Sequence, residues 1–141
     1  MNIFIHLMAN LIVSYFLKIF LNMSDHLLLV FILAGVLIDI DHLFLFAVKY
    51  RKIDPKEWLA RAKMLRKNME SELYIFHSPE FNLLLIAAAF FYEQIWLIIL
   101  SNFIHISLDI IEHFTYHRNF RWIRRWSILF FLSNRLSVHT I

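Results

Sequence analysis

Four long apolar stretches separated by short polar segments dominate the chain. They cover residues 3–21, 27–48, 80–92 and 94–116. A membrane span needs about 20 apolar residues, so we expect each stretch to be a transmembrane helix, although the third is short. One helix over 80–116 would be too long for a bilayer core, which requires a reversal near Glu93 and Gln94. The pattern predicts an all-α integral membrane four-helix bundle made of two helical hairpins.

Polar residues at two turns indicate where helices begin. In the turn over 22–25, Asp25 is the expected N-cap. Ser78 precedes Pro79 and Glu80, which places a capping hydroxyl, a proline at the first helical position and an acid near the positive end of the helix dipole. A helix is therefore predicted to begin at Pro79.

Composition agrees with a bilayer environment. Hydrophobic residues make up 60% of the 141 residues, and the mean hydropathy is +0.62; soluble domains are about 45–50% apolar. Four spans and one loop use nearly the whole length, so we expect a single membrane domain over 1–141. The sequence has no Cys, which excludes disulfides and thiolate ligands. No Lys or Arg precedes the first span and no small-residue cleavage site is present, so this span is expected to be retained and not removed as a signal peptide.

Basic residues predict the orientation of the spans. Twelve of the fourteen Lys and Arg lie in 49–67 (eight) and 118–125 (four). Both segments, and both termini, are therefore expected on the cytoplasmic side of the inner (cytoplasmic) membrane. We expect these cations to contact membrane lipids and not nucleic acid, because both segments adjoin spans.

Two further segments are expected at the membrane surface. Residues 54–57 (Asp-Pro-Lys-Glu) are typical of a helix start and open an amphipathic helix within the cytoplasmic loop 49–76. The residues on its apolar face are Trp58, Ala62, Leu65 and Met69. Trp122 and Trp126 predict an interfacial segment over 118–134, either an aromatic anchor or a short fifth membrane-embedded segment.

Acidic and imidazole side chains interrupt the most apolar segments. They are Asp39, Asp41 and His42 in the second span, and His105 and Asp109, one helical turn apart, in the last. An Asp at mid-span costs about 2.5–3.5 kcal/mol, so such residues normally face a bundle interior and have a function. Lys18 is the only Lys or Arg within the four spans and cannot neutralise these acids together with Glu112. A bound divalent cation does so most simply.

Polar seams run along the first and last spans. The first contains His6, Asn10, Ser14 and Lys18, and the last Asn102, His105, Asp109, Glu112 and His113. The spacings of three and four place each set on one helix face, so the seams are expected to face each other. On the second span Asp39 and His42 share a face, but Asp41 points away. Either the helix unwinds there or Asp41 has a different partner.

The predicted topology brings the ligand-type residues of four segments to one depth near the cytoplasmic leaflet. The candidate metal ligands are His6, Asp39, Asp41, His42, His77, His105 and Asp109. A His/carboxylate set favours zinc, with manganese or iron as alternatives, or a two-metal site bridged by Asp. Asp41 and Glu112 are the catalytic candidates. His6 could instead be a helix-end residue, and His77 part of a capping sequence.

The order of these motifs resembles the membrane-bound metal-dependent hydrolases, a family related to a LexA-regulated inner-membrane protein and distantly similar to zinc-dependent phospholipase C. The similarity extends over residues 1–117 and rests on His6-Leu7, LIDIDH ending at His42, His77-Ser78 and His105-x-x-x-Asp109. It implies that these residues bind metal in a membrane-embedded hydrolase site. The family's His-Arg pair before His77 is replaced here by Glu72 and Leu73. Glu72 is a second-tier ligand candidate.

The function expected first is hydrolysis of a phosphoester, in a lipid or a lipid-linked phosphate, at the cytoplasmic leaflet. A metal-binding or metal-transport protein would use the same ligands but would need a polar path to the far side. A non-catalytic structural membrane protein would hold no metal.

Overall fold

The computed structural model describes residues 3–51, 54, 56, 57, 60, 74–118 and 127–138. Their regular elements are α1 (Ile3–Leu21), α2 (Asp25–Leu37), α3 (Ile40–Tyr50), α5 (Pro79–Ala89), α6 (Ile95–His117) and α7 (Ile128–Val138). No strand occurs in this part of the chain, which confirms the all-α prediction.

Three helical segments are long and apolar enough to cross a membrane. They are Phe4–Leu21, Asp25–Val48 and Ile95–Thr115, and correspond to the first, second and last predicted spans. The stretch predicted as a span over 80–92 is the 11-residue helix α5, which is followed by a turn from Phe90. Eleven residues rise about 16 Å, roughly half the thickness of a bilayer core.

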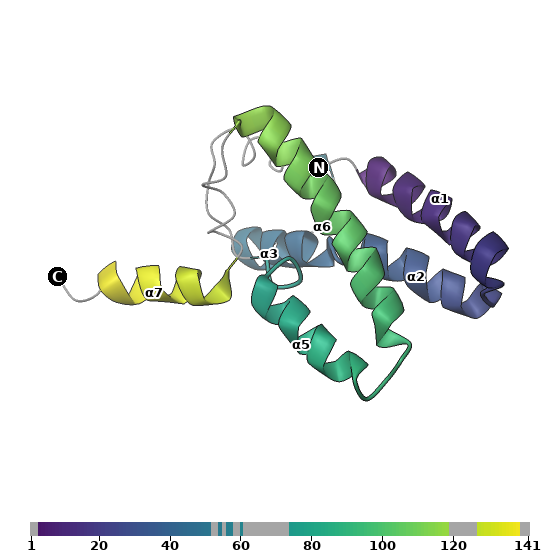
Figure 1. Cartoon of the computed structure of the whole chain (residues 1–141). Coiled ribbons are helices and arrows are strands. Elements are labelled where there is room, and N and C mark those ends of the chain that lie inside the picture. Colours follow the sequence, from purple (N-terminus) through teal and green to yellow (C-terminus); the bar gives the residue numbers. More distant parts are fainter. Residues whose placement is uncertain are drawn as a thin grey trace.

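The helices pack around α2 and α6 (Figure 1). α1 runs antiparallel beside α2, and α6 crosses α2 while also contacting α1 and α5. α7 extends away from this group. The segment from α2 to α3 and helix α6 therefore meet near the middle of the molecule.

The short turn between α1 and α2 differs from the sequence prediction. The N-cap of α2 is Ser24, with φ −69° and ψ 150°, and not Asp25. Asp25 is already helical, and its carboxylate instead contacts Lys18 Nζ at 2.6 Å. Asn22 takes a left-handed conformation (φ 48°), which Asn tolerates better than most residues. A tertiary contact to Lys18 thus replaces the expected local cap.

Two other predicted caps are confirmed. Ser78 is the N-cap of α5, and its hydroxyl accepts a hydrogen bond from the Phe81 N–H at 3.1 Å. Asp54 Oδ1 accepts from the backbone N–H groups of Lys56 (2.9 Å) and Glu57 (3.2 Å). The predicted apolar face of that helix (Trp58, Ala62, Leu65, Met69) and the predicted anchor (Trp122, Trp126) lie outside the described residues.

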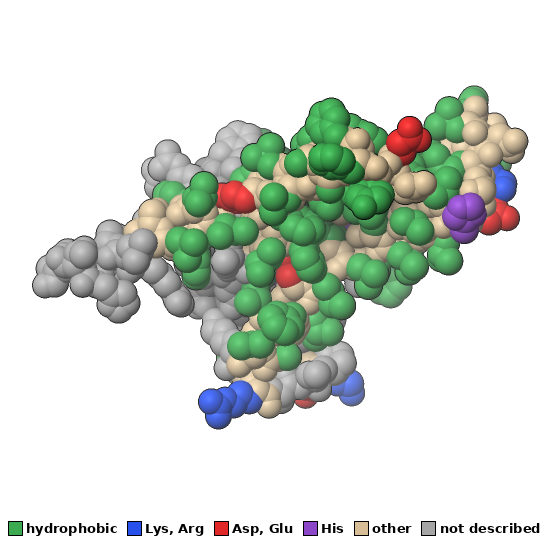
Figure 2. All heavy atoms as spheres, turned by 90° about the horizontal axis from the view of Figure 1, so that it is seen from below, with side chains coloured by type: hydrophobic (Ala, Val, Ile, Leu, Met, Phe, Trp, Pro, Cys, Tyr) green, Lys and Arg blue, Asp and Glu red, His purple; other side chains and the backbone are tan. Residues whose placement is uncertain are grey.

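The described part of the chain has polar side chains inside and apolar side chains outside. Its buried apolar residues are Phe31, Ile38, Phe46 and Ala89. Its buried polar residues are His6, Asn10, Ser14, Asp39, Asp41, His77, Ser78, Ser101, Asn102, His105 and Asp109. Hydrophobic side chains cover most of the face seen in Figure 2, and the Lys and Arg side chains coloured there lie at its periphery. Large apolar patches of this kind are rare on proteins surrounded by water.

Candidate metal centre

The centre forms where the second apolar segment stops being one regular helix. α2 ends at Leu37 and α3 begins at Ile40. In between, the Asp39 N–H bonds to the Val36 carbonyl at 3.4 Å, a tighter turn than an α-helix makes. This change of winding buries Asp39 and Asp41 together, at 4% and 5% exposure. Of the two sequence alternatives for Asp41, the interrupted helix is therefore confirmed.

Four ligand-type atoms from three segments converge beside this break. They are Asp39 Oδ1, His77 Nε2, and His105 Nε2 and Asp109 Oδ2 of α6. His105 Nε2 lies 3.3 Å from Asp39 Oδ1 and 3.4 Å from Asp109 Oδ2. His77 Nε2 lies 3.7 Å and 3.3 Å from the same two oxygens. Two imidazoles thus alternate with two carboxylates, and we call these four side chains the inner set.

These separations match the edges of a metal coordination shell. Ligands about 2.0–2.1 Å from a tetrahedral zinc are about 3.3–3.4 Å apart. Hydrogen bonds from N–H to O are shorter, about 2.9–3.0 Å. The donor set and its spacing therefore fit a divalent cation.

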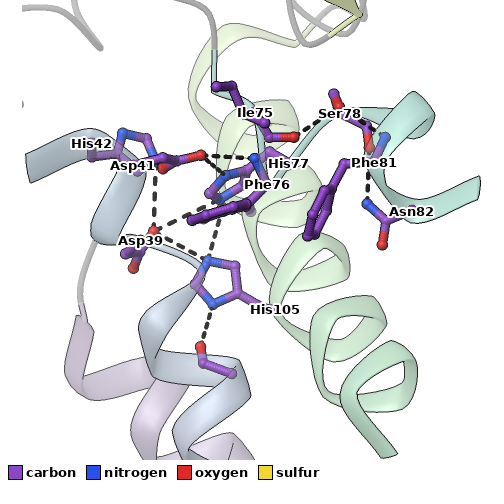
Figure 3. A network of polar contacts seen from close by, with 12 residues as sticks. Asp39, Asp41, His42, Ile75, Phe76, His77, Ser78, Phe81, Asn82 and His105 are labelled. Carbon is purple, nitrogen blue, oxygen red and sulfur yellow. Dashed lines mark hydrogen bonds and ion pairs between the residues drawn. The ribbon is translucent and has the colours of Figure 1, made fainter. Parts of the chain in front are cut away.

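The ring nitrogens that face away from the inner set are held by other groups. His105 Nδ1 is 2.7 Å from the Gly35 carbonyl oxygen. His77 Nδ1 is 3.4 Å from Asp41 Oδ2, which also accepts a hydrogen bond from the Phe76 N–H at 3.0 Å (Figure 3). Such partners orient the rings of metal-binding histidines and fix which nitrogen faces the metal.

His6 and His42 extend the cluster on two sides. His6 Nε2 is 3.3 Å from Asp109 Oδ1, and the His6 ring stacks on His105 with centroids 3.8 Å apart. His42 Nε2 is 3.5 Å from Asp39 Oδ1 and 3.8 Å from Asp41 Oδ1. Three overlapping groups can each hold a metal ion: His6, His105, Asp109; Asp39, His77, His105; and Asp41, His42, His77.

Several buried atoms of the cluster make no hydrogen bond to the described residues. They are both carboxylate oxygens of Asp39, Asp41 Oδ1, Asp109 Oδ1, His42 Nε2 and His105 Nε2. Leaving buried polar atoms without hydrogen bonds costs about 1–3 kcal/mol each, and more for charged groups. A cation at the centre of these atoms would remove that cost.

The carboxylates around the loop before α5 shift the pKa of His77, which lies in that loop. Burial lowers the pKa of His77, but the neighbouring carboxylates of Asp109 and Asp41 outweigh burial and raise the pKa to about 9. His77 therefore carries a proton at neutral pH when no metal is bound, and a cation must displace that proton.

A hydrogen-bonded polar layer lies one helical turn from the centre. Asn10 belongs to the seam predicted on the first span, whereas the parts played by Ser101 and Gly35 were not predicted. The Ser101 hydroxyl faces both Asn10 Oδ1 (2.8 Å) and the Phe31 carbonyl oxygen (2.7 Å). Asn10 Nδ2 donates to the His6 carbonyl oxygen at 2.9 Å. A Cβ added at Gly35 would lie 2.5 Å from Ser101 Oγ and closer still to the Asn10 amide. Gly35 is the only glycine of the chain, and that fact was the signal that could have revealed this close packing.

The structure brings all seven predicted metal ligands together. Glu112, the other catalytic candidate, is half-buried on α6 and belongs to none of the three ligand groups found among the described residues. Glu72 lies outside the described residues. The catalytic roles assigned to Asp41 and Glu112 stay predictions.

Comparisons of the chain with models of known protein families, with curated proteins and with solved structures find no match. The class of protein is defined by its fold and its site alone: a helical protein with three helices able to span a membrane and a buried His/Asp cluster able to hold a metal.

Proposed function

We propose that this protein is a membrane-embedded, metal-dependent hydrolase that cleaves a phosphoester. Its motifs resemble those of the membrane-bound metal-dependent hydrolases. In this proposal α1, the α2–α3 segment and α6 cross the bilayer, α5 enters it partway, and the inner set binds zinc or a similar divalent cation. The observation that carries the proposal is the convergence of four imidazole and carboxylate atoms at 3.3–3.7 Å, all of them buried among apolar helices. A structural role alone would not favour such a costly arrangement.

The residues around the inner set have separate tasks in this proposal. Asp39, His77, His105 and Asp109 bind the cation, His6 holds the second oxygen of Asp109, and Asp41 orients His77. A bound divalent metal supplies Lewis acidity, which acidifies a water and polarises a phosphoryl oxygen. Hydrolysis joins the water oxygen to phosphorus, breaks the phosphorus–oxygen bond to the alcohol, and transfers the water proton to that alcohol. Asp41 and Glu112 are the candidates for moving this proton.

The basic residues that follow α3 and α6 favour a substrate in the lipid headgroup region. Arg51 and Arg118 are exposed residues at the C-terminal ends of α3 and α6. Most other cations of the sequence follow them in 52–67 and 121–125. Such cations attract anionic headgroups. We therefore propose a lipid or lipid-linked phosphoester at the cytoplasmic leaflet as substrate.

Orientation can be tested directly because the parent sequence has no Cys. Cys substituted at Arg51 should resist a membrane-impermeant thiol reagent on intact cells, whereas Cys at Asn22, in the exposed α1–α2 turn, should react. The reverse pattern would place the centre on the other side of the membrane.

The function itself is tested by Asp109→Asn with Glu93→Gln as the matched control. Asn keeps the shape of Asp109 but loses the charge that the cation needs, so bound metal should fall at least about tenfold. Glu93 is exposed in the turn before α6 and should be neutral. Purified variants are analysed for metal content and for release of phosphate or phosphoalcohol from phospholipids and isoprenyl phosphates. Equal metal and equal activity in Asp109→Asn and the parent would refute the proposal.

Metal transport is the second candidate, because buried polar side chains continue past the centre. Asn10, Ser14 and Ser101 are buried, but their hydroxyl and amide groups bond to one another or to nearby carbonyls. Beyond them lies Lys18, whose positive charge opposes a cation. Hydrolysis is therefore preferred. Metal uptake by proteoliposomes containing the parent protein, without hydrolysis of any substrate tested, would favour transport.

A further inference from the structure

The ligand cluster has a closed side and an open side. On the closed side, the side chains of the inner set expose no more than 4% of their surface. On the open side, the His42 side chain is 19% exposed. The Tyr74 ring lies against His42 with centroids 3.7 Å apart and is half-buried. These exposures indicate that a solute would reach the centre from the surface by passing His42.

Asp39 connects the two sides. Its Oδ1 is 3.3 Å from His105 Nε2 and 3.5 Å from His42 Nε2. Figure 3 shows Asp39 between His105 on one side and Asp41 with His42 on the other. Both Asp39 oxygens are buried and make no hydrogen bond to the described residues. Because the same oxygen, Oδ1, faces the ligand atoms on both sides, it can lie between two cations, as the oxygen of a bridging carboxylate does in a two-metal site.

The open side offers three protein ligands, which is the number typical of a catalytic metal site. Asp41 Oδ1 and His42 Nε2 are 3.8 Å apart, and neither makes a hydrogen bond to the described residues. With Asp39 they supply three protein ligands. Structural zinc sites use four protein ligands, whereas catalytic sites use three and keep one position for water or substrate. The inner set has four ligands and the open side has three.

We propose that the centre holds two cations of different character: an inner one bound by the inner set, and an outer, exchangeable one bound by Asp39, Asp41 and His42. This proposal rests on the metal centre proposed above. The outer position is where the phosphoryl group of the substrate binds, because it combines the exposed edge with an incomplete ligand set. The inner cation is the more deeply buried of the two, shares Asp39 with the outer one, and joins the α2–α3 break to α6.

The experiment counts zinc and follows its release from the purified full-length protein. Parent protein loaded with zinc should contain two equivalents, one removed rapidly by a chelator and one at least about tenfold more slowly. His42→Ala should contain one equivalent and lose the rapid phase, while the slow phase is unchanged. His26→Ala, an exposed histidine of α2, is the control and should match the parent.

The outcomes separate this proposal from the one on which it rests. If the parent holds one zinc and His42→Ala releases it at the same rate, the outer site is refuted and the metal centre stands. If the parent binds no zinc, both proposals fail. If His42→Ala is misfolded, Asp41→Asn decides, since an amide oxygen can still accept from the Phe76 N–H. Loss of the rapid phase alone in Asp41→Asn supports the outer site, and retention of both phases refutes it.

Discussion

Charged side chains are exposed at one end of the α1–α2 hairpin and buried at the other. At the turn, Lys18 and Asp25 form an ion pair of 2.6 Å, with the side chains 45% and 89% exposed. At the other end, the inner set is at most 4% exposed, and its nitrogen and oxygen atoms stay 3.3–3.7 Å apart. In the exposed pair, one positive and one negative charge are in direct contact and need no further partner. The buried set has the spacing of ligands around a cation.

Exposure accounts for this difference. A solvated ion pair contributes about 0–1 kcal/mol, so its loss is tolerated. A buried carboxylate without a partner costs several kcal/mol. Substitutions at the two ends should therefore differ greatly in their effects on stability and on metal binding.

The largest effect is expected for His105→Ala. It removes an inner ligand and its bond to the Gly35 carbonyl, so the metal affinity should fall by at least about 100-fold. Metal at 100 times the parent's dissociation constant should stabilise the parent by about 2.7 kcal/mol and the variant by no more than about 0.4 kcal/mol. Thermal unfolding in detergent with and without zinc measures this. An equal metal-dependent shift in both proteins would remove His105 from the site.

A pH dependence of metal affinity is expected next. The pKa of His77 is raised to about 9 by Asp109 and Asp41, against the effect of burial. Below that pH a metal must displace at least one proton, so the affinity should rise by about tenfold per pH unit between pH 7 and 9 and level off above. Calorimetric titration in buffers of different ionisation enthalpy counts the protons released. No proton release at pH 7 would contradict a role for His77 as a ligand.

A smaller effect is expected at the polar layer. Gly35→Ala places a methyl group against Asn10 and Ser101, and such overpacking costs about 1–3 kcal/mol. Leu29→Ala, at an exposed position of the same helix, is the control. The free energy of unfolding measures both. If Gly35→Ala left the free energy of unfolding unchanged, α1, α2 and α6 could move apart at this position without loss of stability.

The smallest effect is expected at the exposed end. Asp25→Asn removes the charge that pairs with Lys18 and should leave the thermal unfolding transition and the metal content almost unchanged, because both side chains are exposed to solvent. A large loss of stability would show that this ion pair is shielded from solvent by a partner or by lipid headgroups.

The sequence predicted which side chains gather in the buried cluster better than it predicted the contacts that hold them there. Asp39, Asp41 and Asp109 stand out because charged residues are rare within long apolar runs, and helical spacing pairs Asp109 with His105. Helix α5 was predicted too long, since an apolar run alone does not mark the turn after Ala89.

Other features depend on tertiary contacts that sequence patterns do not contain. Asp25 was expected to cap α2 but pairs with Lys18 on the neighbouring helix. The bonds of His105 to the Gly35 carbonyl and of Asp41 to the Phe76 N–H join segments far apart in the chain. Backbone partners of this kind have no sequence signature.

The assignment of the buried cluster as a metal centre is tested by elemental analysis and X-ray absorption spectroscopy of the purified parent protein. This assignment predicts at least one divalent metal per chain, with only nitrogen and oxygen ligands at about 2.0–2.2 Å and outer-shell scattering from imidazole. A folded protein that contains no metal, and takes up neither zinc, manganese nor iron when these are supplied, would contradict it.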